Sequence, residues 1–465
     1  MKGSVFRKKS IQDLLAATSG EKSLKRELGA FDLTLLGIGA IIGTGIFVLT
    51  GTGAVTAGPG LTISFVVAAL ACLFAALSYA EFASSVPVSG SVYTFTYATL
   101  GELMAFIIGW DLILEYMLAV SAVSVGWSGY FQSFLSGLGI HLPVALTAAP
   151  GAVEGTFTIF NLPAFVIVMA ITFLLYLGIK ESKRVNNIMV ILKVLVVLLF
   201  IAVAAVYVKR HNWQPFMPMG VGGVFSAAAL VFFAFIGFDA VSSAAEETKN
   251  PAKDLPKGIL FSLLVCTTLY VTVSAVMTGV IPFAEFAGVA HPVSLVLQSA
   301  GQNWVAGIID IGAVLGMTTV MLVMLYGQTR VMFSMSRDGL VPGSLSKVHP
   351  KHKTPYVATW FFGTMSALLG SLVPLDELAK LVNIGTLSAF VLISVAVIVL
   401  RKKQPDLPRA FKCPGVPVIP GLAILFCLFL ILNLGWVTIV RFLVWLLIGL
   451  AIYFLYSRKH SKLNQ

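Results

Sequence analysis

Charged residues are scarce in this chain of 465 residues, where Asp, Glu, Lys and Arg together make up 11%. Ordinary soluble domains contain about 25% of them. Hydrophobic residues make up 58% of the sequence, and the mean hydropathy is +0.95. This composition excludes a water-soluble enzyme of two or three globular domains, and lipid is the expected surroundings of most of the chain.

Cysteine is also scarce, and the spacing of the four cysteines fits neither a disulfide framework nor a metal site. The sequence lacks the Gly-x-x-x-x-Gly-Lys-Ser/Thr motif that binds phosphate, which argues against an ATP-driven pump. No nucleophile and base are paired within the apolar runs. The chain is therefore predicted to be neither an enzyme nor a carrier of a cofactor or metal.

Long apolar runs account for most of the sequence. A membrane helix needs about 20 apolar residues, because each residue adds about 1.5 Å across roughly 30 Å of hydrocarbon. Runs of this kind occur twelve times, and we number them spans 1 to 12: 32–57, 62–86, 102–131, 161–179, 187–208, 222–246, 257–281, 303–335, 356–373, 378–400, 417–434 and 438–457. They lack the short alternating pattern of barrel strands, so an all-α polytopic membrane protein with twelve transmembrane helices is predicted.

The basic residues are distributed unevenly between the loops that join these spans. The chain has 31 Lys and Arg against 20 Asp and Glu, a net charge of +11. With both termini in the cytoplasm, 26 of the 31 lie on the cytoplasmic side, and four lie outside, namely Lys209, Arg210, Lys380 and Arg441. The positive-inside rule therefore predicts a multi-pass protein of the cell membrane with cytoplasmic tails at 1–31 and 458–465. Because topology explains the charge, no nucleic-acid partner is expected.

Two spans carry signs of an interrupted helix. Span 1 has four glycines between Gly37 and Gly45, each costing about 1 kcal/mol relative to Ala inside a helix. Such a cluster fits either close helix packing or a break. In span 6, Gly237 is followed two residues later by Asp239, an acid inside an apolar run. We expect a break in both spans.

The positions of these two spans point to an internal repeat. Spans 1 and 6 are five apart, and because five is odd, two five-helix units beginning there have opposite orientations in the membrane. Secondary transporters with inverted repeats have this arrangement, and their broken helices meet near the midplane to form the substrate site. The predicted units are 32–208 and 209–400, followed by two further helices within 401–457.

A break of this kind suits an amino-acid zwitterion. Unwinding at 43–45 would expose backbone N–H groups at the positive start of a half-helix, where a carboxylate binds without a cationic side chain. The ammonium group can be accepted by carbonyls ahead of the breaks, at Ile41 and around Phe233, Ala234 and Ile236. An L-amino acid is therefore the expected substrate.

Several motifs also resemble a known family. The sequence Ile-Gly-Thr-Gly-Ile-Phe at 42–47 resembles the glycine-rich first-helix signature of the amino acid-polyamine-organocation superfamily of permeases. Three further stretches, at 79–93, 246–259 and 330–342, agree with it. The chain is most similar to bacterial relatives of the cationic amino acid transporters. The resemblance implies twelve helices, a 5+5 inverted-repeat core, two extra C-terminal helices and alternating access.

By the same match, the main-chain part of the substrate site comprises Ile41, Thr44, Gly45, Ile46, Phe233, Ala234 and Ile236. The implied function is secondary active import of small neutral amino acids such as alanine, of cationic ones, or of both. An exchanger and a polyamine or amine transporter of the same fold are the alternatives, although an amine lacking a carboxylate would leave the N–H groups of 44–46 unused. A small membrane subunit or a sterol partner has no signature in the sequence.

Two ionisable residues are candidates for coupling transport to protons. Asp239 follows the expected break, where it either accepts bonds from freed N–H groups or couples its protonation to helix movement, as the resemblance implies. Lys193 in span 5 either extends back towards the cytoplasm or bridges to the carbonyls at 37–40 of span 1. A cation supports span 1 in sodium-coupled relatives, so we expect the Lys193 ammonium to do so here and protons to be the coupling ion.

Two residues are candidates for the side-chain end of the pocket. Asp111 and Glu115 lie on one helix face, and Glu115 either meets a basic substrate side chain or pairs with another helix. Met321 in span 8 either bounds the pocket or packs in the core. An acid would favour cationic substrates and a bulky apolar wall small ones, so the sequence leaves substrate size and charge open.

Overall fold

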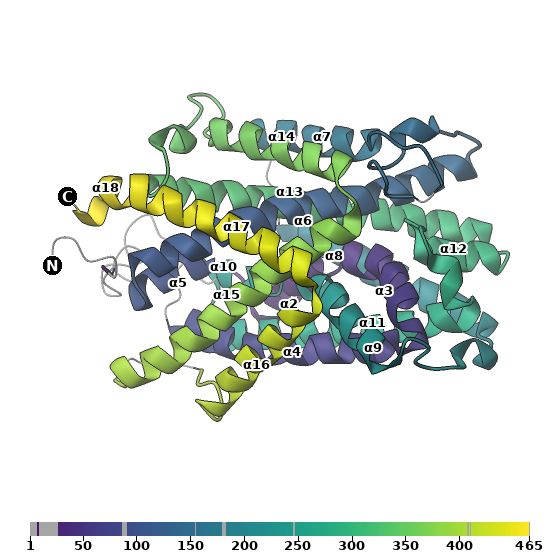
Figure 1. Ribbon diagram of the computed structural model, residues 1–465, viewed down its shortest axis with the longest axis horizontal. Helices are drawn as coiled ribbons and strands as arrows, with labels where there is room; N and C mark the ends of the chain where they lie inside the picture. The colour runs from purple at the N-terminus through teal and green to yellow at the C-terminus, as the bar shows by residue number, and fades with distance from the viewer. Residues whose placement is uncertain are drawn as a thin grey trace.

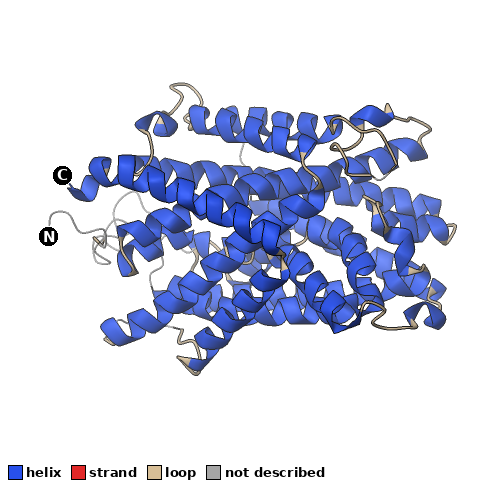
Figure 2. Ribbon diagram, viewed as in Figure 1, coloured by secondary structure: helices blue, strands red, loops and turns tan. Residues whose placement is uncertain are grey.

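The computed structural model shows a protein built of helices joined by loops and turns (Figure 2). The structure describes residues 7–8, 27–85, 91–153, 155–178, 183–244, 247–406, 409 and 411–464. Within these residues there is no strand, and β-pairing is limited to an isolated bridge between Leu28 and Thr248. The prediction of an all-α protein is confirmed.

The helices follow the predicted spans closely. In chain order their bounds are α2 (Ala30–Ile41), η1 (Gly45–Leu49), α3 (Thr50–Ala57), α4 (Leu61–Ser85), α5 (Ser91–Thr99), α6 (Glu102–Gly137), α7 (Leu162–Tyr176), α8 (Lys183–Ala204), α9 (Gly220–Val231), η6 (Phe232–Phe235), α10 (Ala240–Ser243), α11 (Pro251–Val280), α12 (Pro292–Ser299), α13 (Asn303–Arg337), α14 (Tyr356–Leu372), α15 (Leu375–Lys403), α16 (Val418–Asn433), α17 (Trp436–Ile452) and α18 (Arg458–His460). The predicted ends at 86, 179 and 245–246, and nearly all of the tail at 1–31, lie outside the described residues.

Length and apolar composition suit many of these helices to a membrane. Among the described residues, seven helical stretches of 24 to 40 residues are long and apolar enough to cross one, and five shorter apolar helices accompany them. Span 1 corresponds to α2, η1 and α3, and span 6 to α9, η6 and α10. A polytopic membrane fold is therefore confirmed, while the count of twelve spans and the boundaries of the two units remain predictions.

Local chemistry explains where several helices begin. The side chain of Asn161 accepts a hydrogen bond from the N–H of Ala164 at 3.2 Å, which caps α7, and a proline occupies its first turn. Helix α15 has Asp376 and Glu377 in its first turn and three basic residues in its last. Both placements complement the helix dipole.

Helices at corresponding positions of the two halves pack against each other. Helix α6 packs against α13, α4 against α11, and α7 against α14 (Figure 1). The extra helices α5 and α12, which the sequence did not predict, also occupy corresponding places, because each precedes the longest helix of its half. Contact between each helix and its own counterpart is what a two-fold relation between two repeats produces, in agreement with the 5+5 core.

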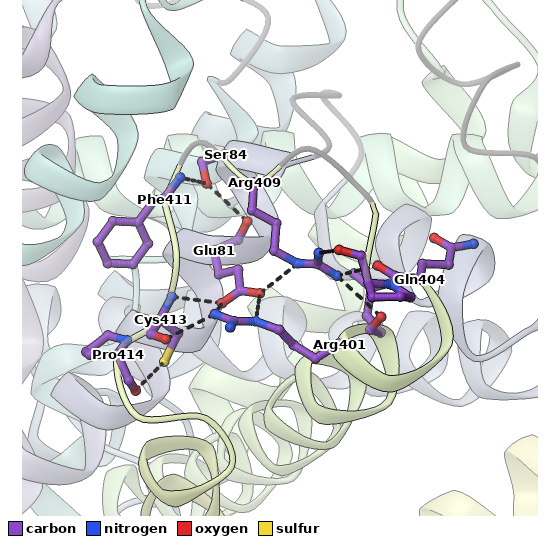
Figure 3. A network of polar contacts seen from close by, with 10 residues as sticks. Glu81, Ser84, Arg401, Gln404, Arg409, Phe411, Cys413 and Pro414 are labelled. Carbon is purple, nitrogen blue, oxygen red and sulfur yellow. Dashed lines mark hydrogen bonds and ion pairs between the residues drawn. The ribbon is translucent and has the colours of Figure 1, made fainter.

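Glu81, from the second motif of the family resemblance, holds the loop between α15 and α16 against α4 (Figure 3). Its buried carboxylate accepts two hydrogen bonds from Arg401, at 2.8 and 2.7 Å, and one from the N–H of Cys413 at 2.8 Å. Arg409 completes the network with a 3.2 Å ion pair. One acid at the end of span 2 therefore binds Arg409 and Cys413, which lie on the connection that leads into the two extra helices.

Replacing Glu81 by Gln is expected to release this loop. Removing one partner of a buried ion pair typically costs about 3–5 kcal/mol. Cys413 reports the release, because its thiol is 2% exposed and burial raises the pKa of Cys413 to about 11, which makes it unreactive at neutral pH. We expect maleimide to label Cys413 of the Glu81→Gln variant at least tenfold faster than that of the parent.

Glu377→Gln is the matched control for this measurement. Glu377 pairs with Lys380 and Arg441, but its side chain is 32% exposed, and exposed pairs contribute about 0–1 kcal/mol. Labelling of Cys413 should be unchanged in this control. Equal labelling rates in the Glu81→Gln variant and the parent would contradict the anchoring role.

A second buried acid brings the two tails together. Glu102 opens α6 and accepts hydrogen bonds from Arg7 of the N-terminal tail at 3.0 Å and from Ser461 of the C-terminal tail at 2.5 Å. The hydroxyls of Tyr97 and Tyr453 donate to the same carboxylate at 2.9 and 3.1 Å. Both tails therefore lie at the same end of the molecule.

Candidate functional site

The first feature of the site is the break in span 1. Helix α2 ends at Ile41, and Ile42 has an extended backbone with φ −73° and ψ 103°. A π-helix, η1, begins at Gly45, and the N–H of Phe47 closes its first turn on the carbonyl of Gly43 at 3.3 Å. The break is thus centred on Ile42 and Gly43, slightly before the predicted 43–45, because Thr44 already has helical angles.

The N–H groups that are predicted to bind the carboxylate lie before the first hydrogen bond of this half-helix. Thr44, Gly45 and Ile46 belong to the first turn of the second half-helix, whose leading N–H groups have no intrahelical acceptor. All three residues are buried. The start of η1 is therefore a buried end of positive dipole that suits an anion.

The second feature is the break in span 6. Helix α9 tightens into the 3-10 helix η6, and Ile236 then has an extended backbone with φ −63° and ψ 134°. Gly237 has φ +116°, a value that other residues rarely adopt. The predicted interruption is observed, and the short helix α10 follows it.

The two breaks touch each other. A Cβ atom added to Gly45 would lie 2.2 Å from Cα of Ala234, and one added to Gly237 would lie 2.8 Å from the carbonyl oxygen of Ala40. Glycine is thus required at both positions for close backbone approach. The structure thereby brings together the main-chain residues predicted from spans 1 and 6.

Tyr270 of α11, which the sequence did not single out, joins the two breaks. Its buried hydroxyl lies 3.0 Å from the carbonyl oxygen of Ile41 and 2.9 Å from that of Ala234, and it donates to both. Its ring contacts Phe65 and Phe235 at 5.4 and 5.3 Å between centroids. A hydroxyl has one proton, so the two carbonyls share it and each retains capacity for another donor.

Replacing Tyr270 by Phe is expected to weaken substrate binding about tenfold. The ring contacts remain, but the variant loses the hydroxyl that orients the two carbonyls and can accept a hydrogen bond from a bound ammonium group, and a hydrogen bond to a charged group contributes about 1.5–3 kcal/mol. The dissociation constant, measured by substrate-induced thermal stabilisation of the purified protein, checks this. Tyr207→Phe, which removes a hydroxyl bonded to Gln302, should bind normally; equal affinities for both variants would contradict a role for Tyr270.

Lys193 lies where the sequence predicted a bridge. Its ammonium donates to the carbonyl oxygen of Gly39 at 2.8 Å, and its side chain is 1% exposed. Its methylene stem packs against Gly316 of α13, where an added Cβ atom would lie 3.1 Å from Lys193 Cγ. The side chain therefore connects the first half of span 1 to span 8, and the alternative of extension to the cytoplasm is wrong for this structure.

The acids of span 3 face α15. Glu115 is buried, with Thr386 of α15 beside its carboxyl group, and a Cβ atom added to Gly385 would lie 2.7 Å from Oδ1 of Asp111. Both alternatives for Glu115, a basic substrate side chain and pairing with another helix, remain predictions. Glu115 also interacts electrostatically with Asp239 of the span 6 break.

Asp239 is the N-cap residue of α10, two residues after Gly237. Its side chain is half-buried, and its carbonyl oxygen accepts bonds from the N–H of Ser242 at 2.9 Å and from the hydroxyl of Ser242 at 2.6 Å. The acid therefore lies at the start of a short helix that follows the break. Its part in coupling remains a prediction.

Helix α13 contacts the span 1 break at Met317, which lies one turn before the predicted pocket residue Met321. The hydroxyl of Thr44 lies 3.3 Å from the sulfur of Met317, and Val320 faces Gly43. Met321 is fully buried on the same helix, four residues beyond Met317. Met317 and Val320 were missed because apolar residues within an apolar span give no signal of their own.

Comparisons with known proteins agree with this geometry. The sequence profile of the amino acid permease family matches residues 28–456. The chain is 97% identical to the branched-chain amino acid permease BcaP of Bacillus subtilis (strain 168), over the full length of both. It is 56% identical to the methylthioribose transporter of the same organism, over 99% of this chain and all of the other, and 34% identical to the chloroplastic cationic amino acid transporter 9 of Arabidopsis thaliana, over 99% and 93%.

A family match across both helix breaks, with relatives of high identity along the whole chain, agrees with the resemblance seen in the motifs. A transporter needs a buried substrate site and no catalytic group, which agrees with the backbone-lined contact between the two breaks. The chain therefore belongs to the amino acid permease family of the APC superfamily: it is a multi-pass membrane protein that transports amino acids, and it is not an enzyme.

Proposed function

We propose that this chain imports L-amino acids with branched apolar side chains by alternating access, coupled to protons. The observation that carries the proposal is the contact of the two helix breaks at Gly45 and Ala234. It places a helix N-terminus and the carbonyls of a second interrupted helix beside one buried point. An α-carboxylate and an α-ammonium are the two groups that such a point would recognise.

The main chain would hold the substrate as follows. The carboxylate would accept hydrogen bonds from the N–H groups of residues 44–46, and the ammonium would donate to the carbonyls of Ile41 and Ala234. The hydroxyl oxygen of Tyr270 lies within 3.0 Å of both carbonyls and would accept a third bond. A polyamine would leave the N–H groups unused, which disfavours it.

The surroundings support an apolar substrate side chain. Met317 and Val320 present apolar surface to the span 1 break, and Glu115 has Thr386 beside its carboxyl group. A cationic side chain would need a buried acid that can face the pocket, whereas an aliphatic one needs only apolar contact. The 97% identical relative is named a branched-chain amino acid permease, which favours valine, leucine and isoleucine over alanine or lysine.

Proton coupling would act through Lys193. While charged, the ammonium fixes the first half of span 1 to α13 by its bond to Gly39 and its packing on Gly316. Deprotonation would remove the charge-assisted hydrogen bond and release span 1, which would open a path to one side. Asp239, which interacts electrostatically with Glu115, would be the candidate acceptor for the proton.

The proposed setting is the cell membrane with both termini in the cytoplasm. The shared contact of Arg7 and Ser461 with Glu102 supports an even number of spans, because it places the two tails at one end. The excess of basic residues in the same set of loops supports a cytoplasmic location for that end.

Uptake into proteoliposomes tests the proposal. We expect labelled valine to accumulate when the outside is acidic, competition by leucine and isoleucine, and little competition by lysine or putrescine. Uptake that follows a sodium gradient and ignores a pH gradient would overturn the coupling. Uptake that requires preloaded amino acid would identify an exchanger, and competition by putrescine alone would identify an amine transporter.

A further inference from the structure

We propose that Asn383 of α15 is a positioning residue that sets the break in span 6 and thereby the affinity of the substrate site. The inference rests on the main-chain site of the proposed function, since it assigns a cause to the position of that site's carbonyls. Asn383 lies in span 10, outside every motif of the sequence and outside the contact between the two breaks.

Two carbonyl groups at the end of α9 need hydrogen-bond donors from outside their own helix. In an α-helix the carbonyls of Ala229 and Leu230 would accept from the N–H groups four residues ahead, at Phe233 and Ala234. The chain instead tightens into the 3-10 helix η6 at Phe232, with bonds to the third residue ahead. A carbonyl at such a change of pitch loses its regular partner, and in a buried segment it must find another.

Asn383 supplies what these carbonyls need. Its amide nitrogen donates to the carbonyl oxygen of Ala229 at 2.8 Å and to that of Leu230 at 2.8 Å. The two N–H bonds of one amide are thus both used. The assignment of nitrogen and oxygen is determined by the contacts, because the reversed amide would place its oxygen against two other oxygens.

The oxygen of the same amide indicates that Asn383 is needed for its two N–H donors. Asn383 is fully buried, and its Oδ1 atom has no hydrogen-bond partner. A buried acceptor without a partner is unfavourable, so an apolar residue would be preferred here if packing alone decided. The nitrogen must therefore compensate, and its two acceptors both belong to the end of α9.

Without these donors, the regular α-helix becomes the better arrangement of this segment. Residues 229–236 would recover bonds to the fourth residue ahead, and the carbonyls of Phe233 and Ala234 would turn from their present directions. Those carbonyls belong to the proposed ammonium site. The loss of Asn383 should consequently weaken substrate binding more than it weakens the fold.

The test uses Asn383→Leu, which keeps the approximate size without donors, and Asn383→Asp, which can donate one bond when protonated. Both are reconstituted, and exchange of labelled valine is measured without a pH gradient. We expect Asn383→Leu to raise KM at least tenfold with Vmax within about twofold of the parent, and Asn383→Asp to fall between the two. Ser388→Ala on the same helix, whose hydroxyl bonds to its own helix at Ile384, should match the parent.

A second measurement is independent of the substrate. In hydrogen–deuterium exchange, Asn383→Leu should change the amides of 229–237 and leave those of α6 and α13 unchanged. Unaltered exchange there, or a lower unfolding temperature with a normal KM, would overturn the inference, as would failure of both variants to fold. Absence of valine exchange by the parent would instead count against the proposed substrate, and the exchange pattern of 229–237 would still decide the role of Asn383.

Discussion

Replacing Lys193 by Met is expected to reduce uptake driven by a pH gradient by about 10- to 100-fold. Methionine preserves much of the apolar stem that packs on Gly316 but removes the donor to the Gly39 carbonyl. A hydrogen bond to a charged group contributes about 1.5–3 kcal/mol, and each 1.4 kcal/mol is about a factor of ten. Initial rates of valine uptake, with and without an acidic exterior, measure the effect.

Lys193→Arg separates the effect of the charge from the effect of deprotonation, and Arg184→Ala is the control. Lys193→Arg keeps a cation that does not deprotonate in proteins, so we expect it to bind substrate but to lose the response to the gradient. Arg184→Ala removes an exposed cation from the same helix and should transport normally. A Lys193→Met variant with full gradient-driven uptake would exclude Lys193 from coupling.

Replacing Gly45 by Ala is expected to abolish measurable substrate binding while the protein remains folded. The added Cβ atom would lie 2.2 Å from Cα and 2.4 Å from Cβ of Ala234, and backbone cannot move aside as a flexible side chain can. Overpacking typically costs about 1–3 kcal/mol, here in the place where the two halves of the site meet. Substrate-induced thermal stabilisation, lost in the variant, measures the effect.

Gly222→Ala is the matched control for this change. Gly222 lies in the first turn of α9, at the other end of that helix from the break, and a Cβ atom added to it would meet nothing within 4 Å. Alanine is favoured over glycine in a helix by about 1 kcal/mol, so this variant should bind normally and unfold at an equal or slightly higher temperature. Normal binding by the Gly45→Ala variant would show that the contact of the breaks does not form the site.

The helices could be predicted from the sequence because long apolar runs and glycine clusters are local features of the chain. A long apolar run indicates burial in lipid or protein whichever helices pack around it. The runs at 102–131 and 303–335 therefore correspond closely to α6 and α13. Glycine clusters are similarly local, because the cost of glycine in a helix depends on its own backbone. Both breaks were predicted for that reason, with the centre in span 1 displaced slightly.

The partners of the breaks could not be predicted in the same way. Tyr270 is one tyrosine in a helix of 30 residues, and nothing in its neighbourhood in the sequence marks its hydroxyl as the donor to two carbonyls. The surroundings of Glu115 were equally hard to predict. The sequence shows which helix face carries Glu115, but it does not show which helix packs against that face. The contact with Thr386 depends on a pairing of spans 3 and 10 that hydropathy does not encode.

The sequence alone therefore predicts the membrane environment, the helical class, the two interruptions and the likeness to amino acid permeases. These follow from composition, from backbone preference and from short motifs, all of which are local. The packing of the helices was needed to identify the side chains that complete the broken backbone, such as Lys193 at Gly39 and Tyr270 between Ile41 and Ala234. The physical reason is that an orphaned carbonyl requires a donor but does not specify which of the surrounding helices will provide it.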